Sequence, residues 1–394
     1  MYHYKQNIGA VVRGLLNGLK HTPETAGPLI GVDPLVLEDT ISGKIEFTDE
    51  LKNKLISITG INERDFYTAE FADSFPVIDD TIEGVRVMKF SDTMQSKRTL
   101  ARGPEKVPYY DYADTAMSNI STFRPEWIKE LYVHDGESAD GLPEWAFNKG
   151  HFEHQITYFI GPVNFYWIDQ DGKRHVEKMN TGDTNYIVPF TPHTFTTREE
   201  GKGLILAVTY GGAIADPVFK SSISKLPLEE YLSGVKTIIK DYIKDLDLSD
   251  FNGGVSIRKH HDAVKYGTDP LNLFLVENKS QPESKIFERI FSTSVGFFES
   301  TPKDRWVYNI GDTKVTLHWG EGKLCDVFPG DSVFIAPSTE HSFVVKDEKV
   351  LDAKLLVVEI RPDGVDPYNE LAVISEFSGD RGLSRVHTET TRWY

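Results

Sequence analysis

The sequence is poor in cysteine and in long apolar runs, and each deficit excludes a class of protein. Its 394 residues include a single cysteine, Cys325, so an internal disulfide and a thiolate metal cluster are both excluded. No apolar run approaches the roughly 20 residues that a membrane span needs, and no signal-peptide pattern precedes the first expected helix. We therefore expect a cytoplasmic protein without a membrane partner.

Positive charge is also in deficit. The formal net charge is -17, whereas general nucleic-acid binding depends on neutralising phosphates with Lys and Arg. We therefore expect no nucleic-acid partner. A small anion is not excluded, because a few local cations outweigh a distant field that salt screens. The length predicts two or three domains, and the ordinary apolar and charged fractions predict globular ones.

The first 72 residues are expected to form a helical bundle. Apolar residues recur at helical spacing from Ile8 to Leu19, which predicts one amphipathic helix. Thr22-Pro23 and Asp33-Pro34 each combine an N-cap residue with proline at the first helical position. Four or five short helices in this order resemble a helix-turn-helix bundle. The lack of a basic recognition helix favours a packing role at least as much as DNA binding.

From about residue 75 the apolar pattern changes to a period of two. Short alternating runs are separated by Gly, Pro, Asn and Asp, which is typical of an antiparallel barrel. A helical segment is expected at roughly 226–246. Strands are expected to resume near Leu271 and to continue to the end of the chain, where the last dozen residues would form a polar arm or tail.

The sequence also repeats itself. G-D-T-N-Y-I-V-P-F-T-P-H-T-F at residues 182–195 returns as G-D-S-V-F-I-A-P-S-T-E-H-S-F at residues 330–343, and this duplication predicts two barrels in tandem. The predicted fold is therefore mainly β with helical domains. Its expected parts are a helix-turn-helix-like bundle at 1–72, a catalytic barrel at 73–215, a helical insert at 216–264 and a degenerate second barrel at 265–394.

The second copy is expected to be degenerate because its histidine, His341, lacks metal-binding partners. Counting back by the interval of the first copy gives Glu299 and Lys303 as those partners, and aligning the preceding tryptophans gives Lys303 and Val307. Neither pair completes a ligand set. We therefore expect His341 to be structural and the second barrel to support the first.

The first copy has two histidines, His151 and His193, at its ends. The G-D…P…H pattern resembles the second motif of the cupin superfamily, whose barrels usually hold one divalent metal. Two histidines and a carboxylate leave positions of Fe(II) open for substrate and O2. Side chains alternate along a strand, so His151, Glu153 and Gln155 share a face and His154 points away. Coordination chemistry alone favours the anionic Glu153 as the third ligand.

The spacing of the candidate ligands favours Gln155 instead. His151-x3-Gln155-x37-His193 resembles the iron triad of the cupin-type non-haem iron phosphonate oxygenase family, in which hydroxypropylphosphonate epoxidase has a glutamate at the middle position. The helical bundle and the degenerate second half are further traits of this family, so the resemblance covers the whole chain. It implies an Fe(II) cofactor held by His151, Gln155 and His193.

The resemblance also implies a set of residues around the substrate. Asn148, Arg102 and Tyr110 match phosphonate-binding positions, and Lys20 best matches a lysine that a neighbouring subunit supplies, which implies a homo-oligomer, either a dimer or a tetramer. Lys20 and Tyr110 would also take part in catalysis. Taken singly, each has a plainer explanation as a surface cation, a helix end or a core aromatic. Their shared order before the metal motif favours the functional role.

The middle ligand distinguishes the branches of this family. The epoxidase and hydroxyethylphosphonate dioxygenase keep a glutamate, which in the dioxygenase lies at the position of Ile187. The members that form methylphosphonate resemble this chain in having glutamine. The resemblance therefore implies O2-dependent cleavage of 2-hydroxyethylphosphonate to methylphosphonate and CO2. The alternative is dioxygenase chemistry, which gives hydroxymethylphosphonate and formate.

Two hypotheses from other classes are weighed against an enzyme. A cupin-type transcriptional regulator would place the bundle on DNA, and the missing basic helix argues against it. A non-catalytic bicupin for storage or binding would contain no stoichiometric iron.

Overall fold

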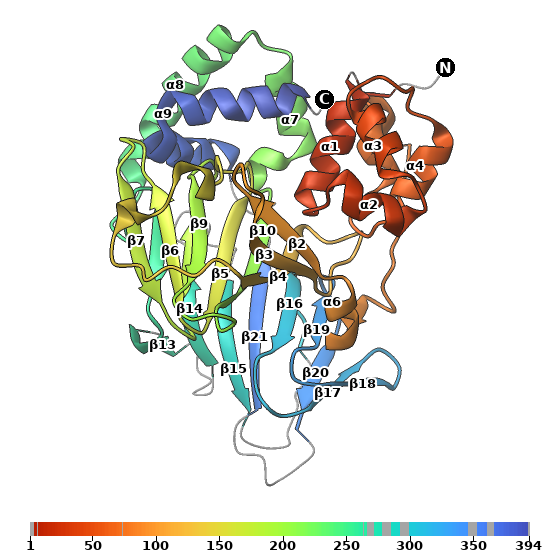
Figure 1. The fold of residues 1–394 in the computed structure, drawn as a ribbon, viewed down its shortest axis with the longest axis vertical. Coiled ribbons are helices and arrows are strands. Elements are labelled where there is room, and N and C mark those ends of the chain that lie inside the picture. Colours follow the sequence, from red (N-terminus) through yellow and green to blue (C-terminus); the bar gives the residue numbers. More distant parts are fainter. Residues whose placement is uncertain are drawn as a thin grey trace.

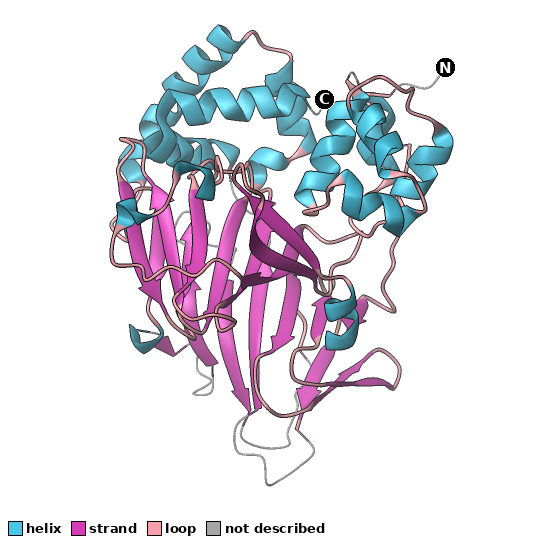
Figure 2. Ribbon diagram, viewed as in Figure 1, coloured by secondary structure: helices cyan, strands magenta, loops and turns pink. Residues whose placement is uncertain are grey.

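Helices lie at one end of two antiparallel β-units in this computed structural model (Figures 1 and 2). The structure describes residues 4–5, 7–72, 74–262, 264–265, 272–277, 285–291, 299–345, 353–360 and 366–392. Leu271, where strands were expected to resume, lies outside these residues. None of the described helices combines the length and hydropathy that crossing a membrane requires.

The N-terminal helices follow the predicted capping signals. The Asp33 side chain accepts a hydrogen bond from the Leu35 amide at 2.9 Å, and that of Thr48 accepts one from Leu51 at 3.2 Å. The apolar stripe of the first helix is buried against the other helices of the bundle. These elements are α1 (Ile8–Gly18), α2 (Pro23–Ile30), α3 (Pro34–Ile41), α4 (Asp49–Leu55), η1 (Glu63–Phe66) and α5 (Ala69–Ala72).

The first β-unit, here called the N-terminal β-unit, has an eight-stranded sheet in the order β11-β12-β8-β5-β10-β4-β3-β2 and a three-stranded sheet in the order β7-β6-β9. Side chains of both sheets share one core. Its strands are β2 (Arg98–Arg102), β3 (Val107–Asp114), β4 (Phe123–Glu130), β5 (His154–Ile160), β6 (Val163–Ile168), β7 (Arg174–Met179), β8 (Thr184–Ile187), β9 (His193–Thr197), β10 (Leu204–Tyr210), β11 (Phe251–Asn252) and β12 (Val255–Arg258).

The C-terminal β-unit repeats this plan with a seven-stranded sheet, β1-β19-β16-β21-β15-β14-β13, and a three-stranded sheet, β18-β17-β20. Its own apolar core lies between them. Its strands are β1 (Val85–Met88), β13 (Val264–Lys265), β14 (Asn272–Glu277), β15 (Lys285–Phe291), β16 (Asp304–Asn309), β17 (Val315–Trp319), β18 (Lys323–Val327), β19 (Ser332–Ile335), β20 (His341–Val344) and β21 (Ala353–Ile360).

The chain exchanges segments between the parts that the sequence suggested. Strand β1 lies within the predicted catalytic barrel but pairs with β19 of the C-terminal β-unit. The predicted insert contains α7 (Pro217–Ser224) and α8 (Leu228–Asp245), but its strand β12 pairs with β8 of the N-terminal β-unit. An alternating pattern predicts that a segment forms a strand but gives no signal of which strand it pairs with.

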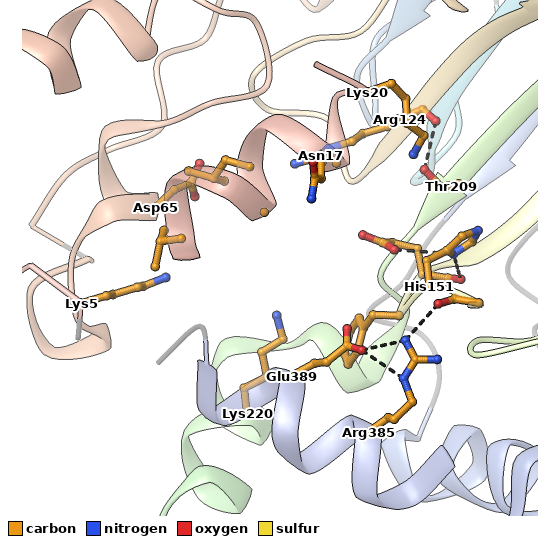
Figure 3. A pocket seen from close by; sticks show the side chains of 17 residues that line it. Lys5, Asn17, Lys20, Asp65, Arg124, His151, Thr209, Lys220, Arg385 and Glu389 are labelled. Carbon is orange, nitrogen blue, oxygen red and sulfur yellow. Dashed lines mark hydrogen bonds and ion pairs between the residues drawn. The ribbon is translucent and has the colours of Figure 1, made fainter. Parts of the chain in front are cut away.

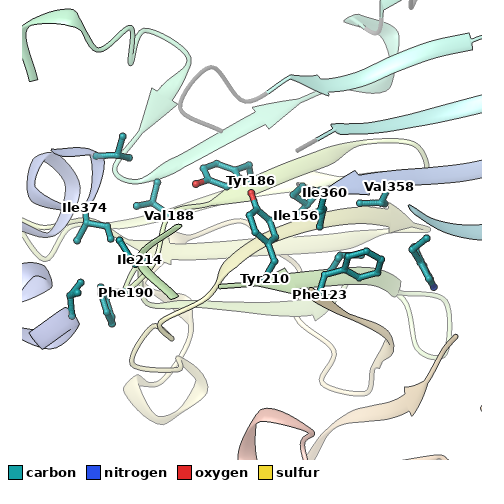
Figure 4. Packing of buried hydrophobic residues seen from close by; sticks show 14 of the residues in the cluster. Phe123, Ile156, Tyr186, Val188, Phe190, Tyr210, Ile214, Val358, Ile360 and Ile374 are labelled. Atoms are coloured by element: carbon teal, nitrogen blue, oxygen red, sulfur yellow. The ribbon is translucent and has the colours of Figure 1, made fainter. Parts of the chain in front are cut away.

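The prediction of strands to the chain end followed by a polar arm is wrong. The chain ends in helix α9 (Pro367–Arg392), which has a non-helical Gly379 within it. This helix lies over the strand ends beside α8 (Figure 1). Its Ile374 packs in a core that also holds Tyr210 of β10 and Val358 of β21, so the helix covers the junction of the two β-units (Figure 4).

Strand register corrects the predicted alignment of the repeat. Gln155 pairs with Ile187, and Ile187 corresponds to Ile335 in the repeated motif. Ile335 pairs with Arg305, so the counterpart of Gln155 is Arg305, and neither Lys303 nor Val307 takes that place.

Hydrogen bonding likewise corrects the residue that was predicted to correspond to His151. The Phe190 amide donates to the carbonyl of His151, as Ser338 does to Thr301. The counterpart of His151 is therefore Thr301, whereas both predicted alignments missed the register. The interval between the two strands differs in the two copies, which a count along the sequence cannot reveal.

Candidate metal centre

Two elements bring the predicted triad together. His151 lies three residues before the first residue of β5, Gln155 lies within β5, and His193 is the first residue of β9. The imidazole rings of His151 and His193 lie 5.1 Å apart between centroids and nearly perpendicular, at 89°. His151 Nε2 lies 3.2 Å from Gln155 Oε1. His151 lies outside the regular strand, so the long reach of an i, i+4 pair in a straight strand does not arise.

Hydrogen bonds to the outer ring nitrogens orient both histidines. His151 Nδ1 lies 2.8 Å from the Glu153 carbonyl, and His193 Nδ1 lies 2.9 Å from the Thr191 carbonyl. A carbonyl oxygen only accepts, so each Nδ1 carries the proton and each Nε2 keeps its lone pair. Carbonyl partners of this kind typically fix metal-binding histidines.

The Gln155 amide is oriented in a matching way. Its Nε2 donates to Thr157 Oγ1 at 2.9 Å, so its Oε1 faces His151 Nε2. Two lone-pair atoms at this separation repel each other unless a cation lies between them. Neighbouring ligands at about 2.1 Å from one ion lie about 3 Å apart. The donor set therefore fits a divalent ion that accepts imidazole and amide ligands.

Both imidazoles are held neutral. Burial lowers the pKa of His151, and Lys20 lowers it further, while the Glu153 carboxylate acts in the opposite direction. Burial and the neighbouring His151 hold the pKa of His193 well below its usual range. Neutral imidazole is the metal-binding form, so both rings are ready to bind near neutral pH.

A cavity of about 210 Å³, here called the inner cavity, surrounds these ligands. All seven residues predicted for the site line it, although they come from four separate segments of the chain. The lining residues are Lys20, Leu100, Arg102, Tyr110, Tyr112, Glu126, Ile128, Asn148, His151, Gln155, His193 and Phe195.

Arg102 and Tyr110 meet next to His193. The Arg102 guanidinium lies 4.8 and 5.0 Å from the ring centroids of Tyr109 and Tyr110, and its Nη1 donates to Thr194 Oγ1 at 3.2 Å. The Tyr110 hydroxyl lies 3.0 Å from the same Thr194 oxygen. Burial raises the pKa of Tyr110, so its phenol stays protonated. Aromatic faces hold the guanidinium at the cavity wall.

Asn148 ties the first ligand segment to the second. Its side-chain Oδ1 accepts hydrogen bonds from the amides of Gly150 and His193, both at 2.9 Å. Its Nδ2 lies 3.0 Å from His193 Nε2 and is thus directed into the cavity. Asn148 therefore holds both ligand segments in register and presents one donor to whatever occupies the space.

Lys20 reaches the cavity from the helical bundle of the same chain. It follows α1 in a left-handed conformation (φ 55°), and Arg98 donates hydrogen bonds to the carbonyls of Leu19 and Lys20 at 2.6 and 3.1 Å. The resemblance implied a lysine from a neighbouring subunit, but here the chain's own Lys20 lines the cavity. The inference of an oligomer from this lysine therefore has no support.

Sequence reasoning missed Glu126, which faces Lys20 across the cavity. Its Oε2 lies 3.9 Å from Lys20 Nζ, and its side chain is largely buried. Burial raises the pKa of Glu126, although the charge of Lys20 opposes that change. Its sequence context, F-R-P-E-W, contains no signal of this role, because only the pairing of β4 brings it here.

Glu153, the alternative third ligand, lies outside the inner cavity. Its carboxylate is 3.6 Å from His151 Nδ1, the ring nitrogen that faces away from Gln155. Burial alone would raise the pKa of Glu153, but His151, Lys20 and Arg124 hold it below its usual range. The geometry thus favours Gln155 as the third ligand.

His154 points away from the cavity, as side-chain alternation predicts. Its ring stacks between Tyr186 and Tyr210, and its Nδ1 lies 2.6 Å from the Tyr186 hydroxyl. Its Nε2 lies 3.5 Å from Glu370 of α9. His154 therefore belongs to the packing beneath α9.

In the part of the chain that the structure describes, no three His, Cys, Asp or Glu side chains come together as a metal-binding group. The candidate triad contains only two residues of these types, and its third member is a glutamine.

Comparisons with known proteins agree with this geometry. No protein-family profile matches the chain. It is 33% identical to methylphosphonate synthase of Nitrosopumilus maritimus (strain SCM1), with 97% of this chain and 94% of that protein covered. It is 26% identical to a structure of Streptomyces albus hydroxyethylphosphonate dioxygenase with 2-hydroxyethylphosphonate and Fe(II) bound, at a TM-score of 0.61, covering 92% and 93% of the chains. A structure of a variant of another hydroxyethylphosphonate dioxygenase, at 14% identity and a TM-score of 0.50 over 89% of this chain and 94% of that chain, shares the fold alone.

Proposed function

This chain belongs to the methylphosphonate synthase family, and we propose that it cleaves 2-hydroxyethylphosphonate with O2 to methylphosphonate and CO2 at one Fe(II) ion. The observation that carries this proposal is the inner cavity, where Gln155, His151 and His193 converge beside cationic side chains. The reaction also forms one water, and all the electrons that reduce O2 come from the substrate. No 2-oxoglutarate or other reductant is therefore needed.

The positive charge of the iron would be balanced by the phosphonate and not by the three protein ligands. His151 and His193 are neutral, and Gln155 adds no charge, so a ferrous ion here keeps its full positive charge. A phosphonate dianion is its natural counterion. Bound ferrous iron would supply the Lewis acid and the one-electron chemistry that O2 activation requires.

The remaining cavity residues bind and orient the substrate. Arg102 offers a planar fork suited to a phosphonate oxyanion, and its guanidinium is held 4.8 and 5.0 Å from the ring centroids of Tyr109 and Tyr110. Asn148 Nδ2 supplies a neutral donor beside His193. Tyr110 fixes Thr194 and Arg102 and stays protonated. A phosphonate buried without such partners would be very costly.

Lys20 and Glu126 form an adjustable pair beside the substrate. At 3.9 Å the two groups are not in tight contact, so Lys20 Nζ can turn from the carboxylate toward an arriving phosphonate. Glu126, whose pKa burial raises, can then hold a proton and avoid an unpaired negative charge. The positive charge of Lys20 thereby balances part of the negative charge of the bound dianion.

The finer features of the fold belong to the same proposal. We interpret the two β-units as tandem cupin barrels, of which the second has lost its metal site, because the G-D…P…H motif lies at matching strands in both. We interpret the helices of residues 8–72 as a helix-turn-helix-like bundle that delivers Lys20 and does not read DNA. A cytoplasmic location and a homo-oligomer stay predictions.

Dioxygenase chemistry is the second candidate, because the structure from Streptomyces albus shares most of the chain. The residue at the dioxygenase glutamate position is Ile187, which is buried and pairs with Gln155 in the sheet. An apolar side chain there and an amide ligand in β5 favour methylphosphonate formation.

Aerobic turnover tests the proposal. The Fe(II)-loaded protein is incubated with 2-hydroxyethylphosphonate under air and, as a control, under argon, and the products are identified by phosphorus NMR. Methylphosphonate formed only with O2 is the expected result. Hydroxymethylphosphonate would establish the dioxygenase reaction instead, and unchanged substrate under air would overturn both.

A further inference from the structure

A wider cavity of about 480 Å³, here called the outer cavity, adjoins the inner one and shares Lys20 and His151 with it. Its wall combines parts that are distant in sequence: the segment before α1, α1 itself, η1, β4, the segment before β5, β10, α7 and α9 (Figure 3). The two shared residues place it directly outside the iron ligands.

Cationic side chains outnumber acidic ones around the outer cavity. The five cations are Lys5, Lys20, Arg124, Lys220 and Arg385, and the three acids are Asp65, Glu153 and Glu389. Arg385 and Glu389 pair at 2.9 Å, so they largely cancel. This excess contrasts with a chain whose formal net charge is -17, so the outer cavity is a positive region on an otherwise acidic molecule.

Lys5 and Lys220 direct their ammonium groups into this space from opposite walls (Figure 3). The Lys5 amide donates to the Phe66 carbonyl at 3.0 Å, which fixes its backbone against η1. Lys220 Nζ lies 5.4 Å from the centroid of the Phe152 ring. Both ammonium groups are therefore positioned by contacts with their own walls.

Burial disfavours the charged form of both lysines. Burial lowers the pKa of Lys5 to about 8, with Asp65 opposing and Lys220 adding to the effect. Burial likewise lowers the pKa of Lys220, although Glu153 opposes the change. An anion between two such ammonium groups relieves both the desolvation and the repulsion.

We propose that the outer cavity is a second anion site, which captures small phosphonate or phosphate dianions through Lys5, Lys220 and Arg124 before Lys20 passes them to the inner cavity. This inference rests on the proposed function for its substrate, but the site itself requires only the dianion. Local positive charge in a cleft raises the rate at which an anion associates. The distant acidic surface is screened at physiological ionic strength and opposes it little.

Replacing the two lysines with neutral residues tests whether the substrate enters through the outer cavity. The double variant Lys5→Gln/Lys220→Gln should lower kcat/KM for 2-hydroxyethylphosphonate by roughly tenfold and weaken its dependence on ionic strength. Its kcat should fall less, and its iron content should match the wild type. The matched control is the double variant Lys173→Gln/Lys240→Gln, which removes two charges elsewhere, because Lys173 is an exposed lysine in the turn before β7 and Lys240 an exposed lysine of α8. Equal kcat/KM and equal salt dependence in the double variant and the control would overturn the proposal.

Binding to metal-free protein separates this proposal from the reaction itself. Methylphosphonate and inorganic phosphate are titrated separately and followed by phosphorus NMR, and neither titration requires turnover. The wild type should bind both dianions more tightly than the double variant. A preference for methylphosphonate would identify the phosphonate as the ligand, and equal affinities would identify a general dianion site. Unchanged affinity in the double variant would contradict the proposal even if turnover succeeds.

Discussion

The two β-units share one framework and differ at its centre. His193 and His341 each begin a strand of a three-stranded sheet. Each directs its Nδ1 to the carbonyl two residues earlier, Thr191 at 2.9 Å and Thr339 at 2.8 Å. Each Nε2 therefore faces the interior of its unit with a lone pair. The framework alone provides a histidine of the same orientation in both halves.

The two centres differ at both remaining ligand positions. Thr301 stands where the N-terminal β-unit has His151, and Arg305 stands where it has Gln155. Arg305 lies 2.6 Å from His341 Nε2 and 2.8 Å from Glu299, and it also pairs with Glu359. A guanidinium thus supplies from within the protein the positive charge that a metal would bring, and neither Thr301 nor Arg305 replaces the lost ligand.

The largest expected effect comes from copying this difference into the first site. Gln155→Arg should place a guanidinium among the ligands, because Gln155 pairs with Ile187 as Arg305 pairs with the corresponding Ile335. We expect turnover to fall by more than about a hundredfold, with the circular dichroism spectrum unchanged. Product formation by phosphorus NMR measures the loss.

Glu153→Ala is the matched control for that variant. It removes a carboxylate two residues away that faces the outer side of His151, so activity should fall far less. If Glu153→Ala loses activity and Gln155→Ala keeps it, the choice of third ligand is wrong.

A smaller effect on Fe(II) affinity is expected when the contacts between α9 and residues 149–150, next to His151, are removed. Arg385 donates to the carbonyls of Lys149 and Gly150 at 2.7 and 2.9 Å and stacks on Phe190, 4.4 Å from its ring centroid. Phe190 in turn donates to the His151 carbonyl at 2.8 Å. Arg385→Ala should weaken Fe(II) affinity by about tenfold to a hundredfold.

Equilibrium dialysis against a chelator measures this change in affinity without turnover. Arg385→Lys should recover part of the affinity, since one ammonium can still reach one carbonyl. Wild-type affinity in Arg385→Ala would show that the ligand segment holds its shape without the helix.

The smallest effect on iron is expected from the C-terminal β-unit. Arg305→Met would remove the guanidinium that pairs with the buried Glu359, and removing one partner of a buried ion pair typically costs about 3 kcal/mol. Urea denaturation should therefore show reduced stability, whereas iron content and kcat should stay at wild-type levels. A large loss of iron in this variant would mean that the two units are not independent at their centres.

The sequence predicts the local and repeated features of this molecule well. Capping residues and apolar periodicity predict the N-terminal helices, and the repeated motif predicts two related halves. The spacing of His151, Gln155 and His193 predicts that they belong to one site, and the structure places all three around one cavity. Each of these features depends on neighbours in sequence or on a motif that recurs.

Features that depend on three-dimensional register could not be predicted in this way. The role of Arg305 was missed because the two copies differ in the interval between their strands, so counting placed the wrong residues opposite His341. Glu126 and Lys220 reach their cavities only through strand pairing and helix packing. Helix α9 carries many polar residues and is interrupted at Gly379. Its sequence therefore lacks the continuous apolar periodicity that would distinguish a helix from a polar tail.

The most direct test of the account is the iron content per chain after anaerobic reconstitution and removal of excess metal. The wild type and His341→Ala should each bind close to one iron per chain, and Gln155→Arg should bind almost none. Three results would contradict this account: two irons per chain in the wild type, a loss of iron in His341→Ala, or full iron occupancy in Gln155→Arg. Each would mean that a β-unit does not need Gln155, in place of Arg305, to bind iron.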